Sequence, residues 1–151
     1  MPTHYQGTAR EKRALDTFIK LIRAGNSVSV ESNRRLSEYS LTASQFAVLE
    51  ALYHLGPMCL SELAGKILRT AGNLTMVLDN LTKRGLAKRV PAKKDRRFVT
   101  AEITSKGRDL IRKVFPEHAA RIAEAMDRLT VEEQEQLAVL CRKLGGVTAS
   151  E

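Results

Sequence analysis

The run TAGNLTMVLDNLTKRGLAKRVPAKKDRRFVTAEI, at residues 70–103, decides the fold of this chain. Its first part predicts a helix from Thr70, which is a suitable N-cap, to about Arg84. Gly85 then supplies the left-handed residue that commonly ends a helix. The apolar face of this helix consists of Leu74, Val77, Leu78 and Leu81. Because that face must be buried, the helix belongs to a larger folded domain.

Two extended segments follow the helix, at residues 86–90 and 98–103. Apolar and polar residues alternate in the second segment, which is the period of a half-buried strand. A polar, basic loop at residues 91–96 connects the two. The sequence therefore predicts a two-stranded β-hairpin, called the wing below, directly after the helix.

Most of the net charge of the chain lies in residues 83–97. Eight basic residues and one acid give this segment a charge of +7, whereas the whole chain carries +8. Such a concentration of charge indicates a docking surface for a polyanion rather than general solubility. A helix followed by a basic wing is the pattern of a unit that places a helix in a DNA groove.

A short helix is expected just before this run, with Ser61 as its N-cap. The two helices would form a helix-turn-helix, in which the second helix is the one that reads DNA. Upstream, Thr42 and Gln45 form a capping box that starts another helix, and Gly56-Pro57 ends it.

Long helices are expected at both ends of the chain. The first runs from about Thr8 to Ser37. Thr104 caps the second, which Pro116 should kink or restart, and Thr130 starts the last. The apolar faces of these helices would form a large exposed patch on a monomer, so an interface is expected there.

The exposed side of the helix at residues 70–84 and the wing provide the candidate DNA contacts. Small and amide-bearing residues suit the major groove, where an asparagine can form two hydrogen bonds with adenine. Basic residues suit the phosphates or the narrower minor groove. Met76 either contacts thymine methyl groups or fills space beside the wing. The predicted contacts are Thr70, Gly72, Asn73, Thr75, Met76, Asn80, Lys83, Arg84, Lys93, Lys94 and Arg96.

Three further residues, Asp79, Asp95 and Arg97, are expected to position the wing. Asp79 shares the helix face of the DNA contacts, where an unpaired carboxylate would repel phosphates. An ion pair with a wing arginine removes that repulsion, and Arg97 is the expected partner. Asp95 is expected to organise the tip of the wing by side-chain hydrogen bonds to the backbone.

Several motifs together resemble the MarR family of winged helix-turn-helix transcription regulators. They are Leu60-Ser61-Glu62-Leu63-Ala64, Asn73-Leu74-Thr75, Asp79-Asn80-Leu81, Lys83-Arg84-Gly85-Leu86 and Asp95-Arg96-Arg97, followed after six residues by Thr104-Ser105-Lys106-Gly107. One departure is Ile103, where the family pattern has leucine. The resemblance covers nearly the whole chain, because long flanking helices are also a property of the family.

The resemblance implies a mostly α, winged-helix fold in a single domain over residues 1–151. Residues 42–104 would form the DNA-binding lobe, and residues 1–40 and 108–151 the dimerisation helices. It also implies a homodimer that binds a pseudo-palindromic operator in double-stranded DNA, most often as a repressor. A small aromatic or phenolic effector would bind between the dimer base and each lobe and release the DNA.

Other functions are disfavoured by what the sequence lacks. It has no catalytic constellation and no metal-ligand spacing, so we expect neither an enzyme nor a cofactor. It has no apolar run of about 20 residues and no signal peptide, so a cytoplasmic protein is expected. Two alternatives stay open: a regulator that senses oxidants through Cys59, which precedes a helix start, and a winged helix that binds proteins without reading DNA.

Overall fold

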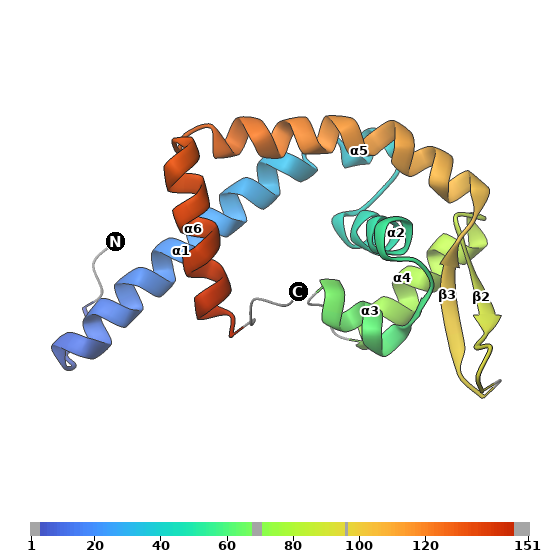
Figure 1. Ribbon diagram of the computed structural model, residues 1–151, viewed down its shortest axis with the longest axis horizontal. Helices are drawn as coiled ribbons and strands as arrows, with labels where there is room; N and C mark the ends of the chain where they lie inside the picture. Colours follow the sequence, from blue (N-terminus) through green and yellow to red (C-terminus); the bar gives the residue numbers. More distant parts are fainter. Residues whose placement is uncertain (1–3, 68–70, 96, 147–151) are drawn as a thin grey trace. The chain divides into compact units, whose positions relative to one another are not determined.

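The computed structural model describes residues 4–67, 71–95 and 97–146 (Figure 1). The chain divides into two compact units, one formed by residues 33–118 and the other by residues 1–32 with 119–151. The first unit contains the whole of the predicted lobe at 42–104. Two of the predicted DNA contacts, Thr70 and Arg96, lie outside the described residues.

Three helices form the core of the unit at residues 33–118: α2 (Ala43–Leu55), α3 (Leu60–Ile67) and α4 (Ala71–Lys83). The predicted capping box is present at the start of α2, and Gly56, with a φ of 85°, follows its last residue. The leucines on the predicted apolar face of α4 are buried. The order of helices and the packing of α4 therefore confirm the predicted helix-turn-helix.

The predicted N-cap of α3 is wrong by two residues. The helix begins at Leu60 rather than after Ser61. The carboxylate of Glu62 accepts a hydrogen bond of 3.0 Å from the backbone N–H of Cys59, which places the cap at Cys59. Because Glu62 occupies the third helical position, it satisfies a donor that a side-chain cap at Ser61 would have left open.

The sheet has three antiparallel strands in the order β1-β3-β2. Strands β2 (Ala87–Pro91) and β3 (Val99–Ile103) form the predicted wing, and Figure 1 shows this hairpin extending past the helices of its unit. Strand β1 (Met58–Cys59) was not predicted, because two residues show no alternation. It pairs with β3 and so attaches the wing to the residues that precede α3.

Two glycines allow the wing to connect closely to the helices before and after it. Gly85 follows α4 with a φ of 71°, the left-handed conformation that was predicted. Gly107 lies in the first turn of α5 (Ser105–Met126). A Cβ at that position would lie 2.2 Å from the carbonyl oxygen of Leu86 and 2.7 Å from Cγ1 of Ile103. Only glycine therefore lets α5 start this close to the wing.

The long helices differ from the prediction at one place. Helix α1 (Ala9–Asn33) ends before Ser37, and the 3-10 helix η1 (Leu36–Tyr39) follows it. The chain turns there because Leu36 enters the core, where it is 4% exposed. Helix α5 continues through Pro116 without restarting. The predicted capping box of Thr130 is present at the start of α6 (Val131–Leu144).

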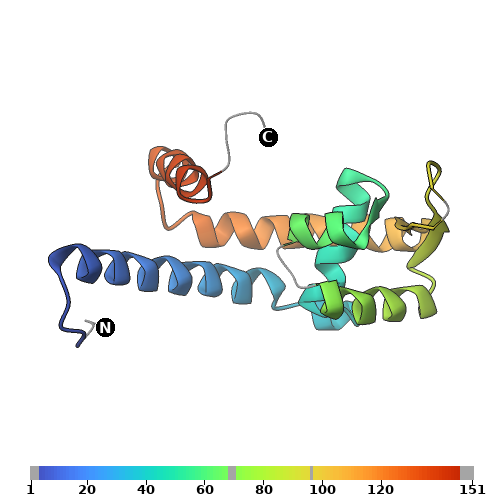
Figure 2. The same ribbon diagram turned by 90° about the horizontal axis from the view of Figure 1, so that it is seen from below.

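The terminal helices expose large apolar side chains. Phe18 on α1 is 58% exposed and Leu140 on α6 is 54% exposed. None of the residues of α6 is buried, and Figure 2 shows that α6 and α1 lie apart although they cross in Figure 1. Within residues 4–67, 71–95 and 97–146, no helix has the length and apolar character needed to cross a membrane.

Candidate nucleic-acid interface

The side of α4 opposite its buried leucines is polar and exposed. Asn73, Thr75 and Lys83 are all exposed there. Met76 is 73% exposed, so it does not fill space beside the wing. Gly72 belongs to the first turn of the same helix. The described part of α4 thus presents most of its predicted contacts to solvent.

The tip of the wing is organised by Asp95, as predicted. Its Oδ1 accepts a 3.0 Å hydrogen bond from the backbone N–H of Arg97. The guanidinium of Arg97 also donates to both oxygens of Asp95, the shortest contact being 2.8 Å. These hydrogen bonds hold the pKa of Asp95 below its ordinary value. The tip is therefore a fixed turn with an ionised carboxylate.

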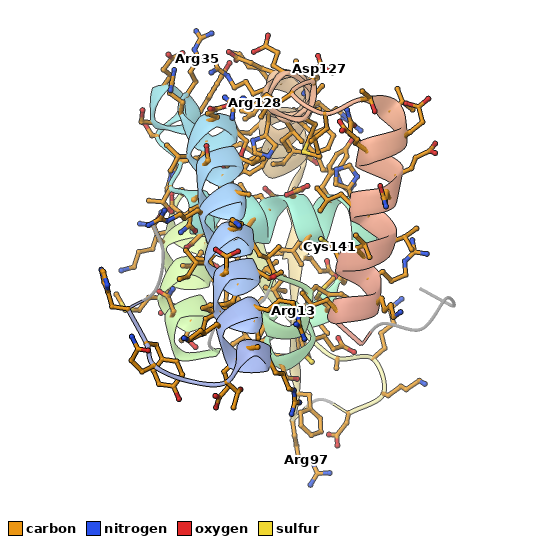
Figure 3. All side chains as sticks on the ribbon, turned by 90° about the vertical axis from the view of Figure 1, so that its left-hand side faces the viewer. Arg13, Arg35, Arg97, Asp127, Arg128 and Cys141 are labelled. Carbon is orange, nitrogen blue, oxygen red and sulfur yellow. The ribbon has the colours of Figure 1, made fainter. Side chains whose placement is uncertain are left out.

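The same pair determines where Arg97 lies. Its side chain is 87% exposed although Asp95 holds it, and Figure 3 shows it projecting from the end of the wing. Lys93 and Lys94 are exposed in the same loop. Lys88 lies back along β2 and pairs with Glu102 at 3.5 Å. Among the described residues of the tip, the positive charge is therefore carried by Lys93, Lys94 and Arg97.

The predicted partner of Asp79 is wrong. Asp79 pairs with Arg89 on β2, with 2.5 Å between Oδ1 and Nη2, and not with Arg97. The strand register explains the difference. Arg89 lies opposite Ala101. Arg97 comes four residues before Ala101 in the chain, a distance of about 13 Å at the rise of a strand. The expectation that a wing arginine neutralises Asp79 is nevertheless correct.

Asp79→Ala should weaken DNA binding although it removes a negative charge. Loss of the carboxylate frees Arg89 and leaves the wing without its tie to α4, so the wing must be ordered on binding. We expect a loss of about 3- to 10-fold, less than a fully desolvated charged hydrogen bond would give, because water screens this partly exposed pair. Fluorescence anisotropy with one operator at one salt concentration measures it. Asp79→Glu should recover part of the affinity, and tighter binding by Asp79→Ala would contradict the tie.

Two predicted DNA contacts have partners inside the protein. The side-chain oxygen of Asn80 accepts a 2.9 Å hydrogen bond from Nε2 of Gln45 on α2. Nη1 of Arg84 donates to the carbonyl of Ser40 at 2.6 Å. Gln45 was recognised from the sequence only as a helix cap. Nothing in its spacing relates it to α4, so these contacts required the tertiary structure.

The Cys59 thiol and a possible metal site are the remaining candidates for a functional site. The Sγ of Cys59 is half-buried and lies 3.1 Å from Oγ of Ser61. Among the residues that the structure describes, no three His, Cys, Asp or Glu side chains gather where they could hold a metal ion.

A helix-turn-helix with an exposed polar face on its second helix, followed by a basic wing, defines a winged-helix DNA-binding protein. A sequence model described as the MarR family matches residues 41–99. Over 134 residues the chain is 40% identical to the HTH-type transcriptional regulator YkoM of Bacillus subtilis, covering 89% of this chain and 87% of that protein. It is 37% identical to MhqR of the same organism, covering 89% and 92%.

A solved structure of BpsR from Bordetella bronchiseptica has a TM-score of 0.78 at 25% identity, over 86% of this chain and 98% of that one. The chain belongs to the MarR family, and it has the winged-helix fold of that family's DNA-binding transcription regulators.

Proposed function

We propose that the protein is a cytoplasmic, homodimeric repressor that binds a pseudo-palindromic operator and is released by a small aromatic effector. One observation carries the DNA-binding part. The exposed polar face of α4 and an 87% exposed Arg97 belong to the same unit. Arg89 and Asp79 tie the wing to α4. A tied wing offers DNA a reading helix and a cationic tip in one fixed arrangement.

The contacts divide by their chemistry. Asn73 and Thr75, near the start of α4, are assigned to base edges in the major groove. Met76 is assigned to a contact with thymine methyl groups. Arg97 is assigned to the minor groove, since its side chain reaches out from the tip while Asp95 fixes its direction. The remaining proposed contacts, mainly to phosphates, are Thr70, Gly72, Lys83, Lys93, Lys94 and Arg96.

Asn73→Ala tests the assignment to base edges. Loss of a side chain that reads a base weakens binding to the recognised sequence and leaves the affinity for other sequences unchanged. We expect a loss of about 1–3 kcal/mol on the cognate operator and little change on random DNA. The operator is obtained by selection from a random DNA pool with the purified protein. An equal loss on both DNAs would move Asn73 to the sugar-phosphate backbone.

A dimer is supported by the exposed apolar faces of α1 and α6. Phe18, Ile22 and Leu140 are each at least 46% exposed in the single chain. Closed two-fold dimers bury such faces against their own copies. Two lobes related by a two-fold axis would bind two half-sites, which is why a pseudo-palindrome is proposed.

A cavity in the unit at residues 33–118 supports the effector. It has a volume of about 500 Å³ and opens between α2, the end of α3 and α5. Its lining includes the polar side chains of Glu50, His54 and Lys66 and the ring of Phe115. The rings of His54 and Phe115 lie 4.7 Å apart between centroids. The volume lies within the range of about 300–1,000 Å³ that small-molecule sites occupy.

BpsR, the structural relative described above, has its DNA binding regulated by 6-hydroxynicotinic acid. For this chain we propose a ligand of similar chemistry, with an aromatic ring beside Phe115 and an acidic group near Lys66. Such a ligand releases DNA only as far as it binds the DNA-free arrangement more tightly than the DNA-bound one.

Filling the cavity should separate effector binding from DNA binding. Ala47 lines the cavity, so Ala47→Phe should abolish release by the ligand and leave operator affinity within about twofold of wild type. A panel of small aromatic acids and phenols is first screened for release of labelled operator. If the variant released the operator at the same ligand concentration as wild type, the effector would bind elsewhere.

A further inference from the structure

A group of hydrogen bonds joins the start of α2 to the exposed side of α4. Oε1 of Gln45 accepts from the backbone N–H of Thr42 at 3.0 Å, and its Nε2 donates to Oδ1 of Asn80 at 2.9 Å. Nη1 of Arg84 donates to the carbonyl of Ser40 at 2.6 Å and reaches Oε1 of Gln45 at 3.4 Å. Gln45 and Arg84 are half-buried. Gln45 therefore connects the cap of α2 to the last turn of α4 and to the residue that follows it.

These contacts give the amide oxygen of Asn80, which is an exposed residue, and Nη1 of Arg84 partners within the protein. An asparagine that reads adenine uses both its amide oxygen and its amide nitrogen on the base. In Asn80 the oxygen is occupied by Gln45. Nη1 of Arg84 is directed to the carbonyl oxygen of Ser40 and to Oε1 of Gln45. Arg84 is also half-buried, whereas the side chain of Arg97 is 87% exposed at the wing tip.

The group continues from α4 toward α5. Ser40 has a φ of 54°, and of the described residues other than glycine it alone has a positive φ. It follows η1, where Tyr39 donates a 3.2 Å hydrogen bond to Glu117 of α5. The ammonium of Lys106, at the start of α5, donates to the backbone carbonyl of Arg84 at 3.0 Å. The C-terminal end of α4 is therefore held by α2, by the residue after η1 and by α5.

We infer that Gln45, Asn80 and Arg84 are positioning residues that set the orientation of α4 for DNA reading, and that they do not contact DNA. The inference rests on the proposed function, because it concerns operator recognition. Base-edge hydrogen bonds tolerate little displacement, so a helix whose orientation varies loses its sequence-specific contacts first. Phosphate contacts made by long basic side chains tolerate more, so binding to random DNA is preserved.

Arg84→Met and Lys83→Met form a matched pair that distinguishes positioning from phosphate contact. Both remove one positive charge from adjacent residues, and Lys83 is exposed. Lys83→Met should reduce the slope of log K against log salt by about 0.9 on operator and random DNA alike. Arg84→Met should leave the slope close to wild type and reduce operator affinity by about 5- to 10-fold, with random DNA unchanged. A slope that falls as in Lys83→Met would overturn the inference for Arg84.

Variants of Gln45 provide a second test of the inference, because Gln45 is not one of the proposed DNA contacts. Gln45→Met should reduce the preference for operator over random DNA by about 5- to 10-fold. Gln45→Glu should restore most of it, because a carboxylate accepts from Thr42, from Arg84 and from the amide of Asn80 after that amide rotates. Combining Gln45→Met with Asn80→Ala should lose no more than either change alone. The melting temperature of each variant is measured in parallel.

The outcomes separate the two proposals. If Asn80→Ala loses operator preference while Gln45→Met keeps it, Asn80 reads DNA directly and the inference is wrong. If Gln45→Met does not fold, the comparison of Gln45→Glu with wild type and the salt slope of Arg84→Met decide. If wild type itself does not distinguish a selected operator from random DNA, the proposed function fails first.

Discussion

Leu140→Asp should convert the protein to a monomer and lower its affinity for the operator by at least about 100-fold, because two linked half-site contacts are replaced by one. Leu140 is 54% exposed in the single chain, so the change removes little packing within the monomer. In the proposed dimer the same side chain is buried, and an unpaired carboxylate there is strongly unfavourable. Sedimentation equilibrium measures the oligomeric state, and fluorescence anisotropy measures the affinity.

Val139→Asp provides a matched control on the same helix. Val139 is 61% exposed, and at 100° per residue it lies opposite the face that contains Leu137, Leu140 and Leu144. It receives the same charge and should remain a dimer with unchanged affinity. A Leu140→Asp protein that is still dimeric and binds as wild type would show that the α6 face is not the interface.

Reversing the charge at Lys93 and Arg97 together should weaken binding to operator and random DNA alike, by at least about 100-fold near physiological salt. Each charged contact contributes about 1.5–3 kcal/mol, and each lost phosphate contact lowers the log K against log salt slope by about 0.9. Arg97 extends from the wing tip with 87% of its side chain exposed. A salt titration with both DNAs therefore measures the contribution of the tip.

The control for charge alone is Arg112→Glu on α5, compared with Arg97→Glu as a single change. The side chain of Arg112 is 61% exposed and pairs with Asp109 at 3.4 Å. Both variants change the net charge equally, so a general electrostatic effect would weaken binding equally. We expect a tenfold or greater loss for Arg97→Glu and a small one for Arg112→Glu. Equal losses would mean that the tip does not contact DNA.

The sequence by itself determined the elements and their order. Thr42 with Gln45 and Thr130 with Glu133 predicted two helix starts correctly, because a capping box is formed within four residues of chain. The buried leucines of α4 and the left-handed Gly85 were predicted for the same reason. Helical periodicity and turn conformation depend on near neighbours, and the sequence contains those neighbours directly.

The sequence also determined the concentration of charge in residues 83–97, because net charge depends on composition alone, and this charge indicated the wing as the polyanion-binding element. The hydrogen bond from the backbone of Arg97 to Asp95 followed from a spacing of two residues. Strand β1 could not be predicted, because its two residues are extended only through pairing with β3.

Tertiary structure alone decided which side chains meet across elements. The partner of Asp79 is Arg89 because the wing register brings β2, and not the tip, beside α4. Gln45 meets Asn80 from 35 residues away in sequence. Such contacts depend on how helices and strands pack. The local sequence around a candidate arginine or amide is the same whether or not the fold brings it close to its partner. For that reason the sequence could only propose the residues of the interface, and the tertiary structure was needed to show that Asn80 and Arg84 form hydrogen bonds with other elements.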